Sequence, residues 1–227
     1  MKTIGILGGI SPQATMDFEK RIHQVSQRII PQHGNSGYPP MLVYYHRKPP
    51  VLTLDGIVPV LPVQIDPDLL EAARWLGSKA DFLVITANGA HVLQKEIEEA
   101  SSLNVLSMID ETLSEVKKRA WKKVGVLGFP MESVPIYTNP LTDMGLAVEL
   151  LDAKRAARLH HAIIALMEGR VFEGAAEEAV QALRQRGVDG IILGCTEIPL
   201  LLGDKANESD LINPIALLAE AAVKFAS

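Results

Sequence analysis

Apolar residues along this chain form short continuous runs and longer stretches with helical spacing. The runs are typical of buried strands and cover residues 3–7, 41–45, 81–86, 123–127 and 191–193. Helical spacing covers residues 14–29, 67–78, 92–101, 112–120, 199–202 and 215–225. A further short strand is expected to end with Met108–Asp110. Because strands and helices alternate, the pattern predicts an α/β protein with mostly parallel sheets, flanked by helices and joined by right-handed crossovers.

The second half of the chain repeats the pattern of the first. Lys123–Phe129 echoes Thr3–Gly9 in its small and aliphatic positions, and Ile191–Thr196 echoes Val84–Gly89. This second match aligns Cys195 with Ala87. The repeat predicts two pseudo-symmetric lobes, residues 1–115 and 116–214, with the active site in the cleft between them. The last helix, 215–227, is expected to pack back on the first lobe.

Composition narrows the class of protein. Of the 227 residues, 48% are hydrophobic, and the net charge is −5, which argues against a surface for nucleic acid or an anionic membrane. The chain has no apolar run long enough to span a membrane and no secretory signal pattern, which favours a cytoplasmic protein. A single cysteine excludes an internal disulfide framework and a cysteine-rich zinc site, and no metal site is expected.

Small residues follow the first strand, in the order Gly8-Gly9-Ile10-Ser11-Pro12. Ser11 is placed to cap the next helix, with Pro12 at its first position. The turn lacks the G-x-G-x-x-G spacing of a dinucleotide site, and no acidic residue ends the second strand. Its backbone amides suit a small carboxylate instead.

Two other strand ends carry polar residues. The second strand runs into His46-Arg47-Lys48, whose charges either meet an anionic substrate or belong to a solvated loop. The strand at 81–86 runs into Ala87-Asn88-Gly89-Ala90-His91, where a capping or supporting role is expected for the histidine.

The only cysteine follows the strand at 191–193, in Gly194-Cys195-Thr196-Glu197-Ile198-Pro199. Open α/β sheets bind ligands at this edge, and a helix N-terminus lowers the pKa of a nearby thiol. Thr196 and Glu197 are poor choices for a core but place a hydroxyl and an acceptor beside the thiol. For Glu197, capping of the next helix is favoured over a hydrogen bond to the thiol.

Together, Gly5–Pro12, Asn88–His91 and Gly194–Pro199 resemble the aspartate/glutamate racemase family over essentially the whole chain. The resemblance is closest to aspartate racemases and, among these, to the enzymes of cyanobacterial microcystin clusters. It implies a racemase of L- and D-aspartate that works without pyridoxal phosphate or any other cofactor, as a homodimer. Two cysteines, one at the tip of each half, act on opposite faces of the substrate α-carbon as base and acid. The substrate-binding residues implied are Ser11, Arg47, Asn88, Gly89, Ser133, Thr196 and Glu197.

One departure from the family pattern decides the chemistry. The first cysteine belongs at position 87, where this chain has Ala87, and a methyl group cannot transfer a proton. Either the chain is a natural single-cysteine relative or Ala87 is an engineered replacement, which the otherwise intact frame favours. The chain is therefore expected to be inactive as a racemase. The side-chain carboxylate of the substrate also lacks a clear partner in the sequence, since only Arg47, Lys48 and Arg170 are available.

Two alternatives stay open. One is a single-cysteine decarboxylase of the same superfold, which protonates one face only. The other is a non-catalytic dicarboxylate-binding protein, in which Ala87 would be natural.

Overall fold

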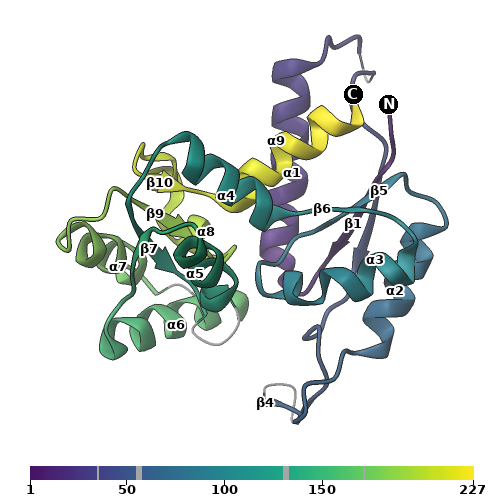
Figure 1. Ribbon diagram of the computed structural model, residues 1–227. Coiled ribbons are helices and arrows are strands. Elements are labelled where there is room, and N and C mark those ends of the chain that lie inside the picture. Colours follow the sequence, from purple (N-terminus) through teal and green to yellow (C-terminus); the bar gives the residue numbers. More distant parts are fainter. Residues whose placement is uncertain (35, 55–57, 130–132, 171) are drawn as a thin grey trace. The chain divides into compact units, whose positions relative to one another are not determined.

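The computed structural model describes residues 1–34, 36–54, 58–129, 133–170 and 172–227. The chain divides into two compact units, each an α/β unit with its own parallel sheet (Figure 1). Unit 1 consists of Met1–Met108 with Leu218–Ser227, and unit 2 consists of Ile109–Leu217.

The sheet of unit 1 has four parallel strands in the order β2-β1-β5-β6. The strands are β1 (Ile4–Gly8), β2 (Met41–Tyr45), β5 (Phe82–Ile85) and β6 (Val105–Leu106). The helices are α1 (Pro12–Ile29), α2 (Pro67–Gly77), the short 3₁₀ helix η1 (Gly89–Leu93), α3 (Gln94–Ser101) and most of α9 (Pro214–Ala226). A small antiparallel pair, β3 (Thr53–Leu54) and β4 (Val58–Pro59), lies in the connection between β2 and α2.

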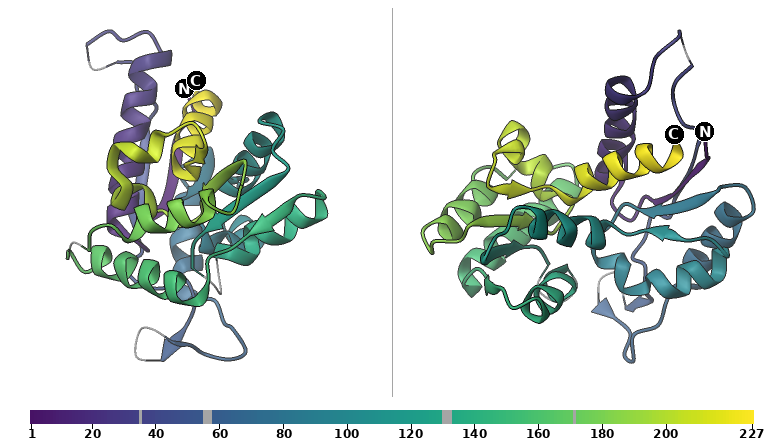
Figure 2. Two further views of the ribbon diagram at one scale, coloured as in Figure 1. Left: turned by 90° about the vertical axis from the view of Figure 1, so that its left-hand side faces the viewer. Right: turned by 45° about the horizontal axis from the view of Figure 1, so that its top comes forward.

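Helices cover both faces of this sheet (Figure 2). On one face, α2 and α3 pack on β1 and β5 through an aliphatic cluster that includes Leu69, Leu76 and Ile97. On the other, α9 reaches β5, where the rings of Phe225 and Phe82 lie 4.8 Å apart edge to face. Burial on both faces explains why β1 and β5 read as continuous apolar runs.

The sheet of unit 2 has the order β10-β9-β7-β8, again all parallel. The strands are β7 (Lys123–Leu127), β8 (Ala147–Glu149), β9 (Gly190–Leu193) and β10 (Leu211–Ile212). The helices are α4 (Met108–Lys118), α5 (Ser133–Asp143), α6 (Ala153–Met167), α7 (Ala175–Arg184), α8 (Ile198–Leu202) and the 3₁₀ helix η2 (Gly203–Asn207).

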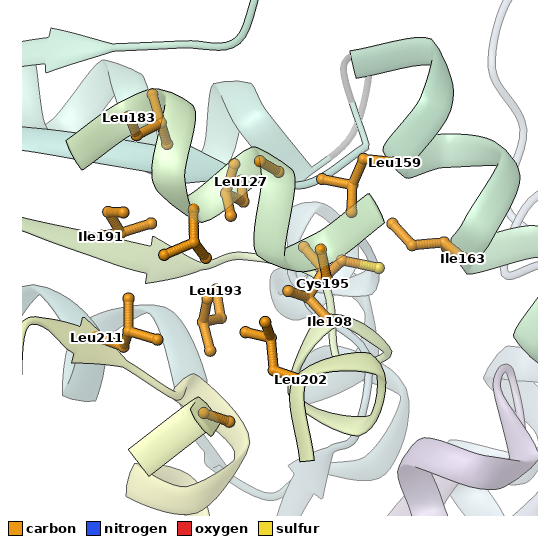
Figure 3. Packing of buried hydrophobic residues seen from close by; sticks show 14 residues of the cluster. Leu127, Leu159, Ile163, Leu183, Ile191, Leu193, Cys195, Ile198, Leu202 and Leu211 are labelled. Atoms are coloured by element: carbon orange, nitrogen blue, oxygen red, sulfur yellow. The ribbon is translucent and has the colours of Figure 1, made fainter. Parts of the chain in front are cut away.

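Two clusters form the core of unit 2, one on each face of its sheet. On one face, α4 and α5 pack on β7, β9 and β10 through residues such as Val116, Tyr137 and Ile192. On the other, α6, α7 and α8 pack on the same sheet, and this cluster contains Cys195 (Figure 3). Cys195 therefore lies where a parallel strand ends against three helices.

The two units have the same topology, which confirms the predicted fold class. Read from β2 and from β8, the strand orders match, so β1 corresponds to β7 and β5 to β9. Leu7 of β1 pairs with Ile85, and Leu127 of β7 pairs with Leu193. Two residues after these partners stand Ala87 and Cys195, which therefore occupy equivalent positions in their own units.

The predicted cap of α1 is confirmed, but the prediction of a strand at Met108–Asp110 is wrong. Ser11 caps α1, accepting a hydrogen bond from the Ala14 N–H, and Pro12 is its first residue. The strand at that place is β6, which ends at Leu106, and Met108 begins α4. Acidic residues in the first turn favour a helix there, and a short apolar run does not by itself distinguish strand from helix.

Candidate active site

Cys195 and Glu197 form a buried pair at the end of β9. The thiol donates a hydrogen bond to Glu197 Oε2 at 2.8 Å, and the Thr196 hydroxyl donates to the same oxygen at 3.2 Å. The three residues are only 6%, 3% and 4% exposed, in the order Cys195, Glu197 and Thr196. A carboxylate this close to a thiol accepts its proton or repels its negative charge, so the geometry allows proton transfer between the two groups.

The helix-capping role favoured for Glu197 is not found. Glu197 occupies the N-cap position of α8, but its side chain makes no capping hydrogen bond, because the carboxylate turns towards Cys195 and Thr196 instead. The direction of this side chain was therefore predicted wrongly from the sequence.

Glycine is required directly before the cysteine. A Cβ on Gly194 would lie 2.7 Å from the Leu127 carbonyl oxygen, at the end of β7. The backbone of the turn therefore packs closely on the neighbouring strand, which fixes the backbone position of Cys195.

At the equivalent edge of unit 1, the Gly8-Gly9 turn is held by hydroxyl groups. Gly9 has a φ of 73°, and its N–H donates to Thr15 Oγ1 at 2.8 Å. The same hydroxyl lies 2.8 Å from Thr86 Oγ1 and donates to the Ser11 carbonyl at 3.0 Å. A Cβ on Gly9 would come within 2.4 Å of Tyr45 Cα. The turn is thus rigid and closely packed, and the sequence had indicated only its glycines and Ser11.

Thr86 is followed by Ala87, Asn88 and Gly89, of which Asn88 is buried and Gly89 begins η1. The nearby His91 ring is held at both nitrogens: Nδ1 lies 3.0 Å from the Ala87 carbonyl oxygen, and Nε2 accepts from the Met108 N–H at 3.2 Å. These bonds require the proton on Nδ1 and a neutral ring. His91 thus has the expected supporting role and is not a free base to replace a cysteine at position 87.

The three basic side chains that follow β2 lie in different surroundings. His46 is buried with Nε2 3.7 Å from Asp66 Oδ2, and burial lowers the pKa of this histidine below its ordinary 6.5. Lys48 pairs with Asp66 at 2.7 Å and with Asp68 at 2.6 Å. Burial alone would raise the pKa of Asp66, but hydrogen bonds from Lys48 and from the Asp68 N–H lower it. His46 and Lys48, two of the three basic side chains considered as partners of an anionic substrate, are therefore unavailable for that role.

Arg47 is the remaining basic side chain after β2. Its φ of 64° lies in the left-handed region, which is uncommon for a residue with a side chain. Its N–H donates to the Gly9 carbonyl at 3.1 Å, and its guanidinium lies 4.6 Å from the centre of the Tyr45 ring. Within the described part of the chain, no carboxylate forms an ion pair with Arg47. Strained backbone of this kind is concentrated at functional sites.

The other predicted residues are less informative. Ser133 is the first residue of α5, and its side chain is outside those described. Arg170 forms an exposed ion pair with Glu168. Among the described residues, no group of three His, Cys, Asp or Glu side chains is arranged to hold a metal ion, and no helix is long and apolar enough to cross a membrane.

A family model supports the resemblance suggested by these motifs. The model described as Asp/Glu/Hydantoin racemase matches residues 7–222, which include both strand ends described above. The chain belongs to this family. It is thus a member of an amino-acid racemase family.

Individual relatives cover the whole chain. A broad specificity amino-acid racemase from Bacillus subtilis is 28% identical over 97% of this chain and 96% of its own length. Two solved structures share the fold: an aspartate racemase from Picrophilus torridus (TM-score 0.76, 24% identity, 100% of this chain and 94% of that one) and an aspartate racemase homologue from Pyrococcus horikoshii (TM-score 0.74, 23% identity, 100% and 99%).

Proposed function

We propose that this protein binds L- and D-aspartate and that Cys195 transfers the α-proton on one face of the bound amino acid. The observation that carries this proposal is the buried hydrogen bond between Cys195 and Glu197, which gives the thiol a proton acceptor 2.8 Å away. Abstraction of an α-proton needs a base whose pKa is matched to the task, and a cysteine beside a carboxylate becomes a stronger base.

The second base of a two-cysteine racemase would stand at position 87. The equivalence of Ala87 with Cys195 in the two sheets supports this assignment, because a duplicated fold supplies one group for each face of the substrate. With Ala87, proton transfer on the second face has no catalyst. The chain as given is therefore expected to exchange the α-proton of one enantiomer and not to racemise it.

Three groups are proposed to hold the substrate. Asn88, Gly89 and Thr196 are assigned to the α-carboxylate, with Ser11 and the Gly8-Gly9 turn beside it. Arg47 is assigned to the side-chain carboxylate, because its positive charge has no internal ion pair in the described chain while Lys48 is occupied by Asp66 and Asp68. Such a guanidinium binds a carboxylate through two parallel hydrogen bonds.

Activity measurements on three proteins test the reaction. Racemisation of aspartate, followed by chiral chromatography, should be absent in this chain and should appear in Ala87→Cys, with a gain of about 10²–10⁴-fold for the restored group. Ala87→Cys combined with Cys195→Ala should lose it again. Full activity of the unchanged chain would refute the two-thiol mechanism. An Ala87→Cys protein inactive on aspartate, glutamate and other common amino acids would refute the racemase assignment.

The presence of Ala87 also favours a second function, proton transfer by one thiol without racemisation. A decarboxylase of this kind would release carbon dioxide from a malonate-type substrate and protonate one face with Cys195. Exchange of the α-proton in deuterated water, followed by NMR, separates the possibilities. A racemase with one base missing exchanges one enantiomer of aspartate, whereas a dicarboxylate-binding protein exchanges neither, even with Ala87→Cys.

The family resemblance also implies a homodimer, which light scattering at several protein concentrations would measure. A thiol that must stay reduced fits a reducing compartment, so we propose a cytoplasmic location.

A further inference from the structure

Arg47 holds a backbone conformation that its surroundings must impose. Its φ of 64° lies in the left-handed region, which costs a residue with a side chain free energy, and such a residue persists only where the neighbouring structure fixes it. One part of this restraint comes from the Gly8-Gly9 turn. The His46 N–H donates to the Gly8 carbonyl at 2.8 Å, and the Arg47 N–H donates to the Gly9 carbonyl at 3.1 Å. The other part comes from one carboxylate, that of Asp66.

Asp66 lies against both sequence neighbours of Arg47. Its Oδ2 is 2.7 Å from Lys48 Nζ and 3.7 Å from His46 Nε2. The first distance is that of a charge-assisted hydrogen bond. The second is too long for a hydrogen bond, and within the described part of the chain His46 Nε2 has no other partner. One carboxylate oxygen is therefore in contact with the residue before the left-handed arginine and with the residue after it.

Asp66 is itself held firmly and carries a charge. Its Oδ1 accepts a hydrogen bond from the Asp68 N–H at 2.9 Å as the cap of α2, and its own N–H donates to the Pro50 carbonyl at 3.1 Å. Burial disfavours the charge, but the hydrogen bonds from Lys48 and from the Asp68 N–H lower the pKa of Asp66 below its ordinary value, so the side chain is a carboxylate at neutral pH. A buried, charged and capped group is thus fixed where the connection from β2 reaches α2.

The guanidinium end of Arg47 is restrained as well. It lies 4.6 Å from the centre of the Tyr45 ring, and the Tyr45 hydroxyl donates to Glu19 Oε1 of α1 at 2.7 Å. The ring is therefore tied to a helix, and a cation stacked on it loses part of its rotational freedom. Because the backbone and the guanidinium are both held, the arginine has one preferred orientation, which two parallel hydrogen bonds to a carboxylate require.

We propose that Asp66 is a positioning residue for Arg47: by binding Lys48 and lying against His46, it keeps the arginine in the left-handed conformation that binds the side-chain carboxylate of aspartate. The inference rests on the proposed function, in which Arg47 binds that carboxylate. Asp66 does not touch the substrate in this role. It sets the fraction of the protein in which the arginine is ready to bind, and the apparent dissociation constant rises as that fraction falls.

Amide hydrogen exchange without substrate tests the restraint itself. Asp66→Asn keeps an acceptor oxygen for the helix cap and removes the charge, so the N–H groups of His46 and Arg47 should exchange about tenfold faster. That factor is roughly the ratio by which an ordinary residue disfavours the left-handed region. Asp68→Asn is the matched control, because it removes the exposed second partner of Lys48, at 2.6 Å, and should leave both rates unchanged. An equal acceleration throughout β5, which reports global unfolding, would reduce Asp66 to a stabilising role and overturn the proposal.

Calorimetry with two ligands tests the consequence for the substrate. Asparagine has the size of aspartate but no charged side chain, so only the binding of aspartate should depend on the orientation of Arg47. In Asp66→Asn, the Kd of aspartate should rise about tenfold, and any binding of asparagine should stay within about twofold. A Kd of aspartate that does not change, or an equal weakening of both ligands, would overturn the proposal.

The two measurements separate this proposal from the proposed function. Unchanged exchange at Arg47 in Asp66→Asn overturns the positioning role even if the unchanged chain binds aspartate. Faster exchange in a chain that binds neither enantiomer of aspartate upholds the restraint on Arg47 and rejects the proposed substrate instead. If Asp66→Asn fails to fold, Lys48→Met removes the other half of the same ion pair, and unchanged exchange at Arg47 in that variant overturns the proposal.

Discussion

Replacing Glu197 with glutamine tests whether the carboxylate controls the basicity of Cys195. Glutamine keeps the size of the side chain and an acceptor oxygen but removes the charge. In the unchanged protein, a thiolate at 195 would face a carboxylate oxygen at about the 2.8 Å of the present hydrogen bond. If the two charges move apart to about 4 Å, they repel by about 4 kcal/mol at the effective dielectric constant of buried sites. That repulsion corresponds to about three pH units in the titration of the thiol.

The Thr196 hydroxyl donates to the same carboxylate oxygen and offsets part of this repulsion. We therefore expect Glu197→Gln to lower the pKa of Cys195 by about one to three units. Two consequences have opposite signs. Alkylation by iodoacetamide at neutral pH should become faster, because more of the thiol is ionised. Exchange of the substrate α-proton should become slower, because the thiolate is a weaker base.

The measurement is the pH dependence of the NMR resonance of the single, isotope-labelled cysteine, together with the two rates. Glu177→Gln is a matched control, since this glutamate lies on α7 in an exposed pair with Lys205. A midpoint that stays in place or rises after Glu197→Gln would show that no negative charge acts on the thiol. The same result would remove the basis for treating Cys195 and Glu197 as an acid–base pair.

Two further predictions concern unit 1. Arg47→Gly should abolish the calorimetric heat of aspartate binding, and retained binding would contradict the assignment of Arg47 to the side-chain carboxylate. The unfolding free energy should change by less than about 1 kcal/mol, because the relief of about 1–2 kcal/mol of left-handed strain is offset by the loss of stacking on Tyr45 and by the flexibility of glycine in the unfolded chain. The buried neutral His46 has a lowered pKa, so the unfolded chain binds its proton first and stability should fall as the pH drops below 6.5. Urea unfolding at pH 7 and pH 5 should show a smaller loss in His46→Gln, and an equal loss would exclude this histidine as the cause.

Much of the fold could be predicted from the sequence because its central strands, β1, β5, β7 and β9, are buried on both faces. Continuous apolar runs such as Phe82–Ile85 alternate with stretches of helical spacing, and this alternation favours buried strands. Ser11-Pro12 is a strong helix start. The prediction failed around Met108 because β6 has only two residues, which are too few to show an alternation of apolar and polar positions. The pair β3 and β4 has the same difficulty, with two residues in each strand.

The candidate site was predictable in its positions but not in its contacts. The motif identified Cys195 and Glu197 as neighbours, yet whether the carboxylate turns to the helix or to the thiol depends on a rotamer that no spacing reveals. Lys48 and Asp66 are far enough apart in sequence that nothing local indicates their ion pair. Tyr137 carries no signal beyond an apolar position on a helix, and only the structure shows that its ring lies beside Gly194.

The division of the chain into units has a consequence for its synthesis. Unit 2 is one continuous segment, but unit 1 needs Leu218–Ser227, which a ribosome makes after the whole of unit 2. Those residues bring Phe225 to Phe82, and the Ala226 carbonyl accepts a hydrogen bond from the Lys2 N–H at 2.8 Å. A nascent chain can therefore complete unit 2 while unit 1 still exposes apolar surface at β5. Unit 1 can complete its fold only after Leu218–Ser227 is made, so we expect it to be the unit that chaperones would need to shield.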